Sequence, residues 1–196
     1  MQEKEVIYTF KIVIVGAGGV GKTCLFNRFC FNSFNFDTSQ TIGLSFHSMD
    51  LKVNNVYQEP YSSNKFIVNS IFDFGGQDRF KPLIPKFLGG ANGAILTFDL
   101  TNEDSLEMLN YWFDLLMNHT NGAEIPKVLV GSKSDLLSEI PESKQIKKSN
   151  INKFLKDKEL DAYYWTSALK NYNVIAVFKE LNNLMLKRKK IPFSVL

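Results

Sequence analysis

The segment Gly16-Ala17-Gly18-Gly19-Val20-Gly21-Lys22-Thr23 decides how this chain of 196 residues can fold. It matches the pattern G-x-x-x-x-G-K-[ST], in which a glycine-rich loop turns its backbone N–H groups toward phosphate oxygens. An apolar run from Phe10 to Val15 precedes it and predicts a buried strand, and a helical pattern from Cys24 to Phe31 follows it. In that context Lys22 can reach the β- and γ-phosphates, and the Thr23 hydroxyl can ligate Mg²⁺. A glycine-rich turn that binds nothing is the alternative, and the register of strand, lysine and threonine argues against it.

The composition limits the classes of function open to this chain. It is 44% hydrophobic, which suits one domain with a sizeable core, and its net charge of +3 is too small to indicate a nucleic-acid partner. Cys24 and Cys30 form neither a disulfide framework nor a zinc site, and free thiols are typical of a reducing compartment. No apolar stretch approaches the roughly 18 residues of a membrane span, and neither Gln2 nor the last residues, 193–196, match a lipidation motif. We therefore expect a cytoplasmic protein without a leader or lipid anchor.

Six apolar segments predict the strands of one sheet: Phe10–Val15, Leu44–Val53, Phe66–Phe74, Gly93–Asp99, Lys127–Gly131 and Ala162–Ser167. The runs 95–98 and 128–130 are continuously apolar, as in strands that are covered on both faces. The segment 44–53 alternates between apolar and polar residues, which suits an edge strand.

Amphipathic helices are predicted between these strands. Apolar residues recur about every 3.6 positions in two of them: Leu106, Leu109, Phe113, Leu116 and Met117 in one, and Val174, Val177, Phe178, Leu181, Leu184 and Met185 in the other. A shorter helix is predicted over 149–158. The alternation of strands and helices predicts an α/β fold, with a six-stranded, mostly parallel sheet and helices on both faces. Ligands of such folds bind at the carboxyl ends of the strands, where loop 16–23 lies.

Two further segments suit the phosphate end of a nucleotide. In Asp73-Phe74-Gly75-Gly76-Gln77, Asp73 can hold Mg²⁺ through water, a glycine N–H can meet the γ-phosphate, and Gln77 can orient the attacking water. A plain Gly-Gly turn is the alternative. Thr41-Ile42-Gly43 is a weak signal alone, but the Thr41 hydroxyl can join the Mg²⁺ ligands when the γ-phosphate is present.

Two segments suit the base end. Gly131-Ser132-Lys133-Ser134-Asp135 follows the fifth predicted strand, and a carboxylate there can accept two hydrogen bonds from guanine, which adenine cannot supply. The stem of Lys133 can lie on the face of the base. Thr166-Ser167-Ala168 ends the sixth strand, where backbone N–H groups can meet the guanine 6-oxo oxygen.

These motifs, in this order, resemble those of the Ras superfamily of small GTPases, and the resemblance runs from about Phe10 to Leu186. It implies a P-loop NTPase fold, the G domain, as a single domain over residues 1–196. The segment Thr41-Ile42-Gly43-Leu44-Ser45-Phe46 is similar to the Rab branch. Gly75-Gly76-Gln77 is similar instead to the Arf branch or to Roc domains, which carry two glycines before the glutamine.

The resemblance implies a role for each matching residue. Catalysis would involve Gln77, Lys22 and Thr41, and Mg²⁺ would be held by Thr23, Thr41 and, through water, Asp73. GTP and GDP would be bound by Gly18, Gly19, Val20, Gly21, Lys22, Thr23, Cys24, Phe34, Thr41, Gly76, Ser132, Lys133, Asp135, Ser167, Ala168 and Leu169. The ranges Asn32–Phe46 and Asp73–Leu88 would be the two switches, which meet effectors, exchange factors and GTPase-activating proteins.

The chain departs from the family pattern in four places. Ser132 replaces an Asn that bridges the base and the phosphate loop, so a lower nucleotide affinity is expected, and Leu169 replaces a Lys. An insertion near 54–65 is expected to be an exposed hairpin loop, either inert, which we favour, or a partner site. The basic tail 187–196 begins Lys187-Arg188-Lys189-Lys190; we favour a solvated helix end over attraction to anionic lipid, which would give at most weak electrostatic membrane contact.

The sequence therefore predicts a monomeric GTP-binding switch that hydrolyses GTP slowly and recruits effectors in membrane trafficking or signalling. It would be cytoplasmic or peripheral at a membrane surface. A nucleotide-binding scaffold with little hydrolysis is the alternative, and intact Gln77, Thr41 and Gly18 argue against it. An ATPase or small-molecule kinase is a third candidate; Asp135 and the Ser167-Ala168 pair argue against it, and competition between GTP and ATP would distinguish them.

Overall fold

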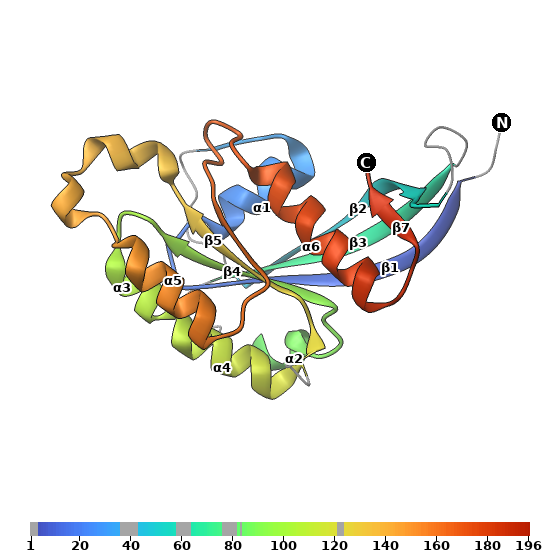
Figure 1. The fold of residues 1–196 in the computed structure, drawn as a ribbon, viewed down its shortest axis with the longest axis horizontal. Helices are drawn as coiled ribbons and strands as arrows, with labels where there is room; N and C mark the ends of the chain where they lie inside the picture. Colours follow the sequence, from blue (N-terminus) through green and yellow to red (C-terminus); the bar gives the residue numbers. More distant parts are fainter. Residues whose placement is uncertain (1–3, 36–42, 58–63, 76–81, 83, 121–123) are drawn as a thin grey trace.

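The computed structural model describes residues 4–35, 43–57, 64–75, 82, 84–120 and 124–196. Its centre is a seven-stranded sheet in the order β6-β5-β4-β1-β3-β2-β7 (Figure 1). The strands are β1 (Glu5–Val15), β2 (Leu44–Asn55), β3 (Lys65–Phe74), β4 (Gly93–Asp99), β5 (Lys127–Ser132), β6 (Ala162–Trp165) and β7 (Phe193–Val195). All neighbours pair in parallel except β2, which runs antiparallel to both β3 and β7. The predicted α/β fold with a mostly parallel sheet is confirmed.

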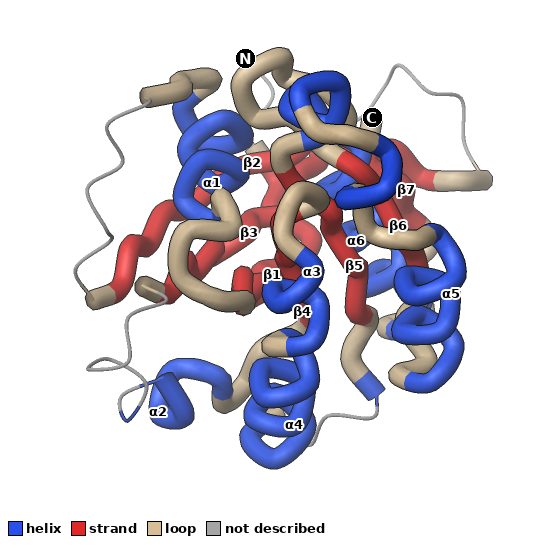
Figure 2. The backbone as a smooth tube through the Cα atoms, turned by 90° about the vertical axis from the view of Figure 1, so that its left-hand side faces the viewer, coloured by secondary structure: helices blue, strands red, loops and turns tan. Residues whose placement is uncertain are grey.

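Helices cover both faces of this sheet. They are α1 (Lys22–Phe31), α2 (Ile84–Leu88), α3 (Glu103–Glu107), α4 (Leu109–His119), the 3₁₀ helices η3 (Ser134–Glu139) and η4 (Glu142–Lys144), α5 (Lys148–Asp157) and α6 (Val174–Arg188). One core packs α1 and α6 against one face, and a second packs the segment from α2 to α5 against the other (Figure 2). The continuously apolar strand β4 is buried along its whole length, as its sequence predicts for a strand covered on both sides.

The strand count corrects the prediction, because the tail 187–196 contains a seventh strand. After α6 the chain turns back, and β7 pairs with Val53, Asn54 and Asn55 at the end of β2. Val53 is fully buried and Val195 is 7% exposed, so the pairing also closes an apolar contact over the core. β2 is therefore an edge strand only where β7 does not cover it. Pairing with β7 gives the exposed backbone groups of that edge their partners.

The predicted helix through Leu106 and Met117 is divided into α3 and α4 at Met108. Within the predicted insertion, β2 extends to Asn55 and β3 begins at Lys65, and residues 58–63 lie outside the described part of the chain. Among the described residues, no helix combines the length and the apolar character that a bilayer span requires.

β1 lies between β3 and β4, and the helices that follow β1 and β4 pack on opposite faces of the sheet. The connections that follow β1 and β4 therefore leave the sheet toward opposite faces. Open α/β sheets form their ligand crevice at the carboxyl ends of two such neighbouring strands.

Candidate nucleotide-binding site

The glycine-rich loop 16–21 joins β1 to α1 in a conformation that needs glycine. Gly16 has φ of +149°, and a Cβ atom there would lie 2.2 Å from the carbonyl oxygen of Thr97 on β4. Gly19 and Gly21 also have positive φ, at 76° and 92°. Only glycine adopts such angles without strain, so these positions allow the backbone to fold tightly at the start of α1.

Lys22 is the first residue of α1, and its side chain turns back into the loop. It is 5% exposed, and its Nζ donates to the carbonyl oxygens of Gly16 at 2.9 Å and Ala17 at 2.7 Å. Burial lowers the pKa of Lys22 to about 8, against the opposing effect of the nearby Asp73 carboxylate. The loop therefore encloses a cation.

Thr23 and Asp73 form the predicted metal-binding pair. The Thr23 hydroxyl donates to Asp73 Oδ2 at 2.6 Å, while the other oxygen, Oδ1, is buried and has no hydrogen-bond partner. Burial raises the pKa of Asp73 to about 6, although the Thr23 hydrogen bond and Lys22 act in the opposite direction. An unsatisfied carboxylate oxygen beside a hydroxyl fits a hydrated Mg²⁺, which prefers oxygen ligands and retains water.

No group of three or more His, Cys, Asp or Glu side chains in the described ranges could hold a metal ion by itself. A Mg²⁺ at Thr23 and Asp73 would take further oxygen ligands, and phosphate oxygens and water are ligands that Mg²⁺ usually takes.

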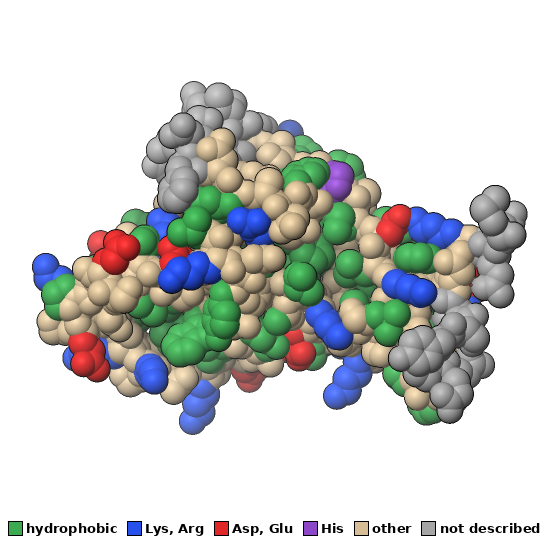
Figure 3. Space-filling model, turned by 90° about the horizontal axis from the view of Figure 1, so that it is seen from above, with side chains coloured by type: hydrophobic (Ala, Val, Ile, Leu, Met, Phe, Trp, Pro, Cys, Tyr) green, Lys and Arg blue, Asp and Glu red, His purple; other side chains and the backbone are tan. Residues whose placement is uncertain are grey.

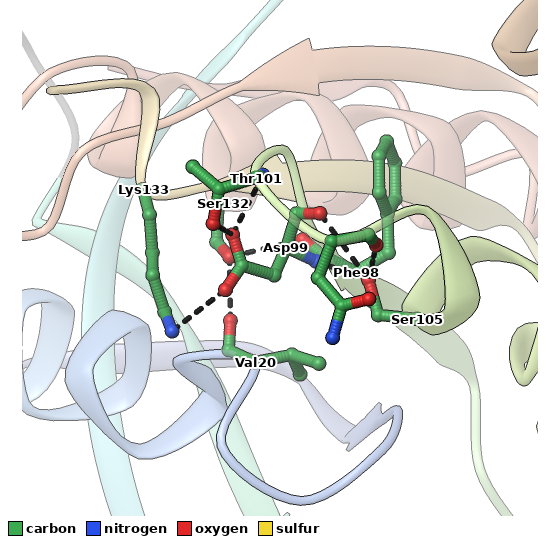
Figure 4. A network of polar contacts seen from close by, with 8 residues as sticks. Val20, Phe98, Asp99, Thr101, Ser105, Ser132 and Lys133 are labelled. Carbon is green, nitrogen blue, oxygen red and sulfur yellow. Dashed lines mark hydrogen bonds and ion pairs between the residues drawn. The ribbon is translucent and has the colours of Figure 1, made fainter. Parts of the chain in front are cut away.

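Ser132, the last residue of β5, connects the predicted base-binding segment to the phosphate loop. Its hydroxyl lies within hydrogen-bonding distance of the carbonyl oxygen of Val20 in the loop and, at 2.9 Å, of that of Phe98 on β4 (Figure 4). A hydroxyl carries one proton, so it donates to one of these carbonyls at a time. Ser132 therefore contacts the phosphate loop, although it replaces the Asn that makes this link in the family pattern.

Lys133 follows in a left-handed conformation, with φ of 59°. Its Nζ lies 2.7 Å from Oδ2 of Asp99 at the end of β4. Asp99 was not among the predicted site residues. The signal in the sequence is an ionisable residue that ends an otherwise uncharged run, 93–98.

The remaining base-site residues lie in two neighbouring loops. Asp135 is in η3, and Ser167, Ala168 and Leu169 follow β6, which ends at Trp165, two residues earlier than predicted. The N–H of Ser134 donates to the carbonyl of Thr166 at 3.0 Å and joins the loops. Ser167 is almost fully buried, and Leu169 is 39% exposed.

Arg28 on α1 anchors the second of these loops, a role that the sequence did not indicate. Its guanidinium donates to the carbonyl of Ala168 at 2.7 Å and to that of Asn32 at 2.9 Å. Cys24 and Phe34, on and just after α1, are both partly exposed.

Thr41, Gly76 and Gln77 lie outside the described residues, as does Arg79. The described ends of the two predicted switches meet, because the N–H of Gly75 donates to the carbonyl of Gly43 at 2.8 Å. Next to them, Phe46 on β2 and Phe72 on β3 are cross-strand partners whose ring centroids lie 5.0 Å apart. Phe46 is 55% exposed, so these rings form an aromatic surface at the end of the first predicted switch.

Comparison with known proteins agrees with this geometry. A model of the Ras family matches residues 11–187. The "Ras-related protein RABA1b" of Arabidopsis thaliana is 34% identical over 181 residues, which cover 91% of this chain and 76% of that protein. The "Ras-related protein Rab-9A" of Rattus norvegicus is 32% identical over 174 residues, 87% and 80% of the two chains. The "GTP-binding protein ypt4" of Schizosaccharomyces pombe is 31% identical over 188 residues, 96% and 76%. The chain therefore belongs to the Ras family of small GTPases and is Rab-like.

Proposed function

We propose that this protein binds GTP and GDP with Mg²⁺, hydrolyses GTP slowly, and recruits effectors in its GTP-bound state, in membrane trafficking or signalling. The observation that carries the proposal is the arrangement around Thr23: its hydroxyl meets a buried Asp73 with one unsatisfied oxygen, and the Lys22 ammonium lies inside the adjacent loop. This is a binding site for a metal-bound polyphosphate.

On the phosphate side, Lys22 has three N–H donors and two loop carbonyls accept from it, so one donor is left for a phosphate oxygen. Mg²⁺, when bound, would neutralise charge on the β- and γ-phosphates. Thr23 would ligate it directly and Asp73 through water. The start of α1 adds the positive end of its dipole.

On the base side, Asp135 selects guanine in this proposal. We expect Asp135→Asn to shift preference from GTP to xanthosine triphosphate, because an amide can donate to the 2-oxo group that a carboxylate repels. Displacement of fluorescent GDP by GTP, xanthosine triphosphate and ATP measures this. Asp157→Asn, which removes an exposed carboxylate from α5, is the matched control. Unchanged GTP affinity with no gain for the xanthine nucleotide would reject the role of Asp135.

The switch mechanism rests on Thr41, Gly76 and Gln77. In the proposal, the γ-phosphate draws Thr41 and Gly76 inward, and Gln77 places the attacking water. The hydrogen bond between Gly75 and Gly43 supports a coupled response, because it joins the two segments at their described ends. The aromatic surface of Phe46 and Phe72 begins at the last residue of the first switch, so a partner that binds the switches would also contact it.

A nucleotide-binding scaffold with little hydrolysis remains the second candidate. Both candidates bind guanine nucleotides, so a multiple-turnover GTPase assay, with and without a cell extract that supplies an activating protein, separates them. Release of phosphate that stops after less than one equivalent in both conditions would favour the scaffold. Stronger displacement of fluorescent GDP by ATP than by GTP would reject both in favour of an ATP enzyme.

We further propose a monomer that is cytoplasmic or peripheral at a membrane. Size-exclusion chromatography with light scattering tests the oligomeric state. On the face drawn in Figure 3, the Lys and Arg side chains are scattered among side chains of other kinds rather than gathered in one patch.

A further inference from the structure

Asp99 is a buried carboxylate with no place in the mechanism proposed so far. It is the last residue of β4, which is buried throughout, and it is 6% exposed. A carboxylate that loses water must find partners, because burial without them strongly disfavours the ionised form. Its partners therefore indicate what the residue does.

The two oxygens of Asp99 have separate partners. Oδ1 accepts from the backbone N–H of Thr101 at 2.9 Å and from the Thr101 hydroxyl at 2.7 Å, which closes the turn after β4. Ser105 supports the same turn, because its hydroxyl oxygen accepts from the N–H of Asp99 at 2.9 Å. Oδ2 instead faces the Lys133 ammonium across the site, at 2.7 Å (Figure 4).

This contact holds the Lys133 side chain beside the phosphate loop. A Cβ atom built on Gly21 would lie 4.0 Å from Lys133 Cε, so the end of the stem passes over the loop. The register of β4 and β5 brings the two groups together, since Asp99 pairs with Ser132, the residue before Lys133. One end of the side chain is fixed by the strand and the other by Asp99.

We propose that Asp99 is a positioning residue of the nucleotide site, which holds the Lys133 ammonium so that the methylenes of Lys133 lie ready to cover one face of the base. The inference rests on the proposed nucleotide binding and adds a residue to it. A long side chain that is fixed before binding loses less rotamer freedom when the ligand arrives. The carboxylate also compensates the charge, so Lys133 presents its apolar stem to the base.

Asp99→Asn separates positioning from the support of the turn. An amide oxygen can still accept from Thr101, but the amide nitrogen would then face the ammonium, and two donors cannot bond. We expect release of fluorescent GDP to become about tenfold faster, because the bound nucleotide would then have to order the Lys133 side chain by itself. The increase should be the same with Mg²⁺ and with EDTA, because it originates at the base.

Asp161→Asn is the matched control. Asp161 accepts from the N–H of Lys127 at 2.7 Å, pairs with Arg188 at 2.8 Å, and has a side chain that is 17% exposed. It therefore combines a backbone hydrogen bond with an ion pair, as Asp99 does, but at the amino end of the sheet. The temperature of thermal unfolding should fall for both Asp99→Asn and Asp161→Asn. The rate of GDP release should change by less than about twofold for Asp161→Asn.

The double variant of Asp99 and Lys133 gives the decisive measurement, which is the rate of GDP release. Lys133→Met keeps an apolar stem and removes the ammonium, so it should accelerate release by itself. Adding Asp99→Asn to Lys133→Met should then change release by less than about twofold, because Asp99 acts through Lys133. If the two effects multiply, or if Asp99→Asn releases GDP at the wild-type rate, the positioning role is wrong while nucleotide binding stands.

Two variants keep the test valid if Asp99→Asn does not fold. Thr101→Val weakens the turn but leaves Oδ2 on Lys133, and Lys133→Met leaves the turn intact. The proposal requires Lys133→Met, but not Thr101→Val, to release GDP faster than wild type. Faster release from Thr101→Val with wild-type release from Lys133→Met would overturn it. Wild-type protein that binds neither GDP nor GTP would instead reject the proposed function itself.

Discussion

Asp73 is fully buried beside the Lys22 ammonium, and this makes stability depend on pH. Burial raises the pKa of Asp73 from 3.8 to about 6, so the folded protein favours the protonated form more than the unfolded chain does. The stability contribution of such a group is fully present below pH 3.8 and is lost as the pH rises through about 6. A carboxylate that must be ionised to serve a metal therefore costs stability at neutral pH.

We expect Asp73→Asn to raise the free energy of unfolding of the metal-free protein at pH 7.5 by about 1–3 kcal/mol, since an amide does not ionise. The difference from wild type should shrink as the pH falls from 7 to 4. Urea unfolding in EDTA across this range measures it, with Asp157→Asn as an exposed control. The same variant should bind Mg²⁺–GDP more weakly than wild type. A stability difference that is independent of pH would show that the Asp73 charge is not the cause.

Spacing along the chain predicted part of this site and could not predict the rest. Lys22, Thr23 and the glycines lie in one short motif, so their mutual positions follow from a single strand–loop–helix unit. Arg28 contacts Ala168 over a separation of 140 residues, and Asp99 meets Lys133 only through the register of two strands. Contacts of this kind depend on tertiary packing, which a local pattern does not contain.

At the scale of elements, β7 joins the end of the β2–β3 hairpin to α6. Val53, Asn54 and Asn55 pair with it, and the N–H of Val195 donates to the side chain of Asn183 on α6 at 2.9 Å. Lys65 on β3 also lies over the ring of Phe193, 5.3 Å from its centroid. The strand thus closes the amino end of the sheet, opposite the phosphate loop.

Removal of residues 191–196 should destabilise the protein without weakening nucleotide affinity. We expect a loss of about 2–4 kcal/mol, because Val53 would be exposed, the apolar contact of Val195 would be lost and three residues of β2 would lose their pairing. Urea unfolding of the GDP-bound protein and GDP affinity should be measured together. Asn183→Ala removes only the hydrogen-bond partner of Val195, so it should lower the free energy of unfolding by less than the truncation does. Equal stability of the truncated and full chains would mean that β7 does not hold the hairpin.

The periodic elements were predicted well, and the short ones were not. Strands such as β4 and helices such as α6 carry enough apolar residues for their period to define them. β7 has three residues and exists because β2 offers a free edge, so no local signal marks it. The division between α3 and α4 at Met108 could not be predicted from periodicity either, because the buried residues of the two helices continue one apolar stripe.

At the scale of the whole molecule, the basic cluster 187–190 is partly bound to the protein itself. Arg188 pairs with Asp161 and donates to the carbonyl of Glu124, and the Lys189 ammonium lies 6.0 Å from the centroid of the Tyr8 ring. Fewer charges are therefore available to anionic lipid than the sequence suggests. Each basic residue near such a surface contributes about 1 kcal/mol, so the remaining attraction is small.

We accordingly expect weak, salt-sensitive membrane contact at most. Co-sedimentation with vesicles of acidic and of neutral lipid at low salt measures it, and Lys187→Gln with Lys190→Gln should abolish whatever binding the acidic vesicles show. Binding that survives about 0.5 M salt, where screening acts over a few ångströms, would contradict an electrostatic mechanism.

Hydrolysis by the isolated protein should be slow because no described arginine is placed to stabilise the transition state. Switch I, 32–46, contains no arginine, and Arg28 is committed to the carbonyls of Ala168 and Asn32. Arg79, which follows Gln77 by two positions, is the remaining candidate in the predicted switches. We expect an unassisted rate of about 10⁻⁴–10⁻³ s⁻¹, accelerated by a partner that supplies an arginine.

Single-turnover hydrolysis of GTP by the purified protein measures this rate. Gln77→Leu should lower it while GTP affinity stays unchanged, because the glutamine orients water and does not bind the nucleotide. Arg28→Lys is the control for the arginine argument: it should change nucleotide release more than the chemical step, since Arg28 anchors the loop at Ala168. A wild-type rate above about 10⁻² s⁻¹, the level of enzymes with an arginine in cis, would place a catalytic arginine within this chain. Arg79→Ala would then have to lower that rate by a factor of about 10 or more, because a group that stabilises the developing charge contributes directly to the barrier.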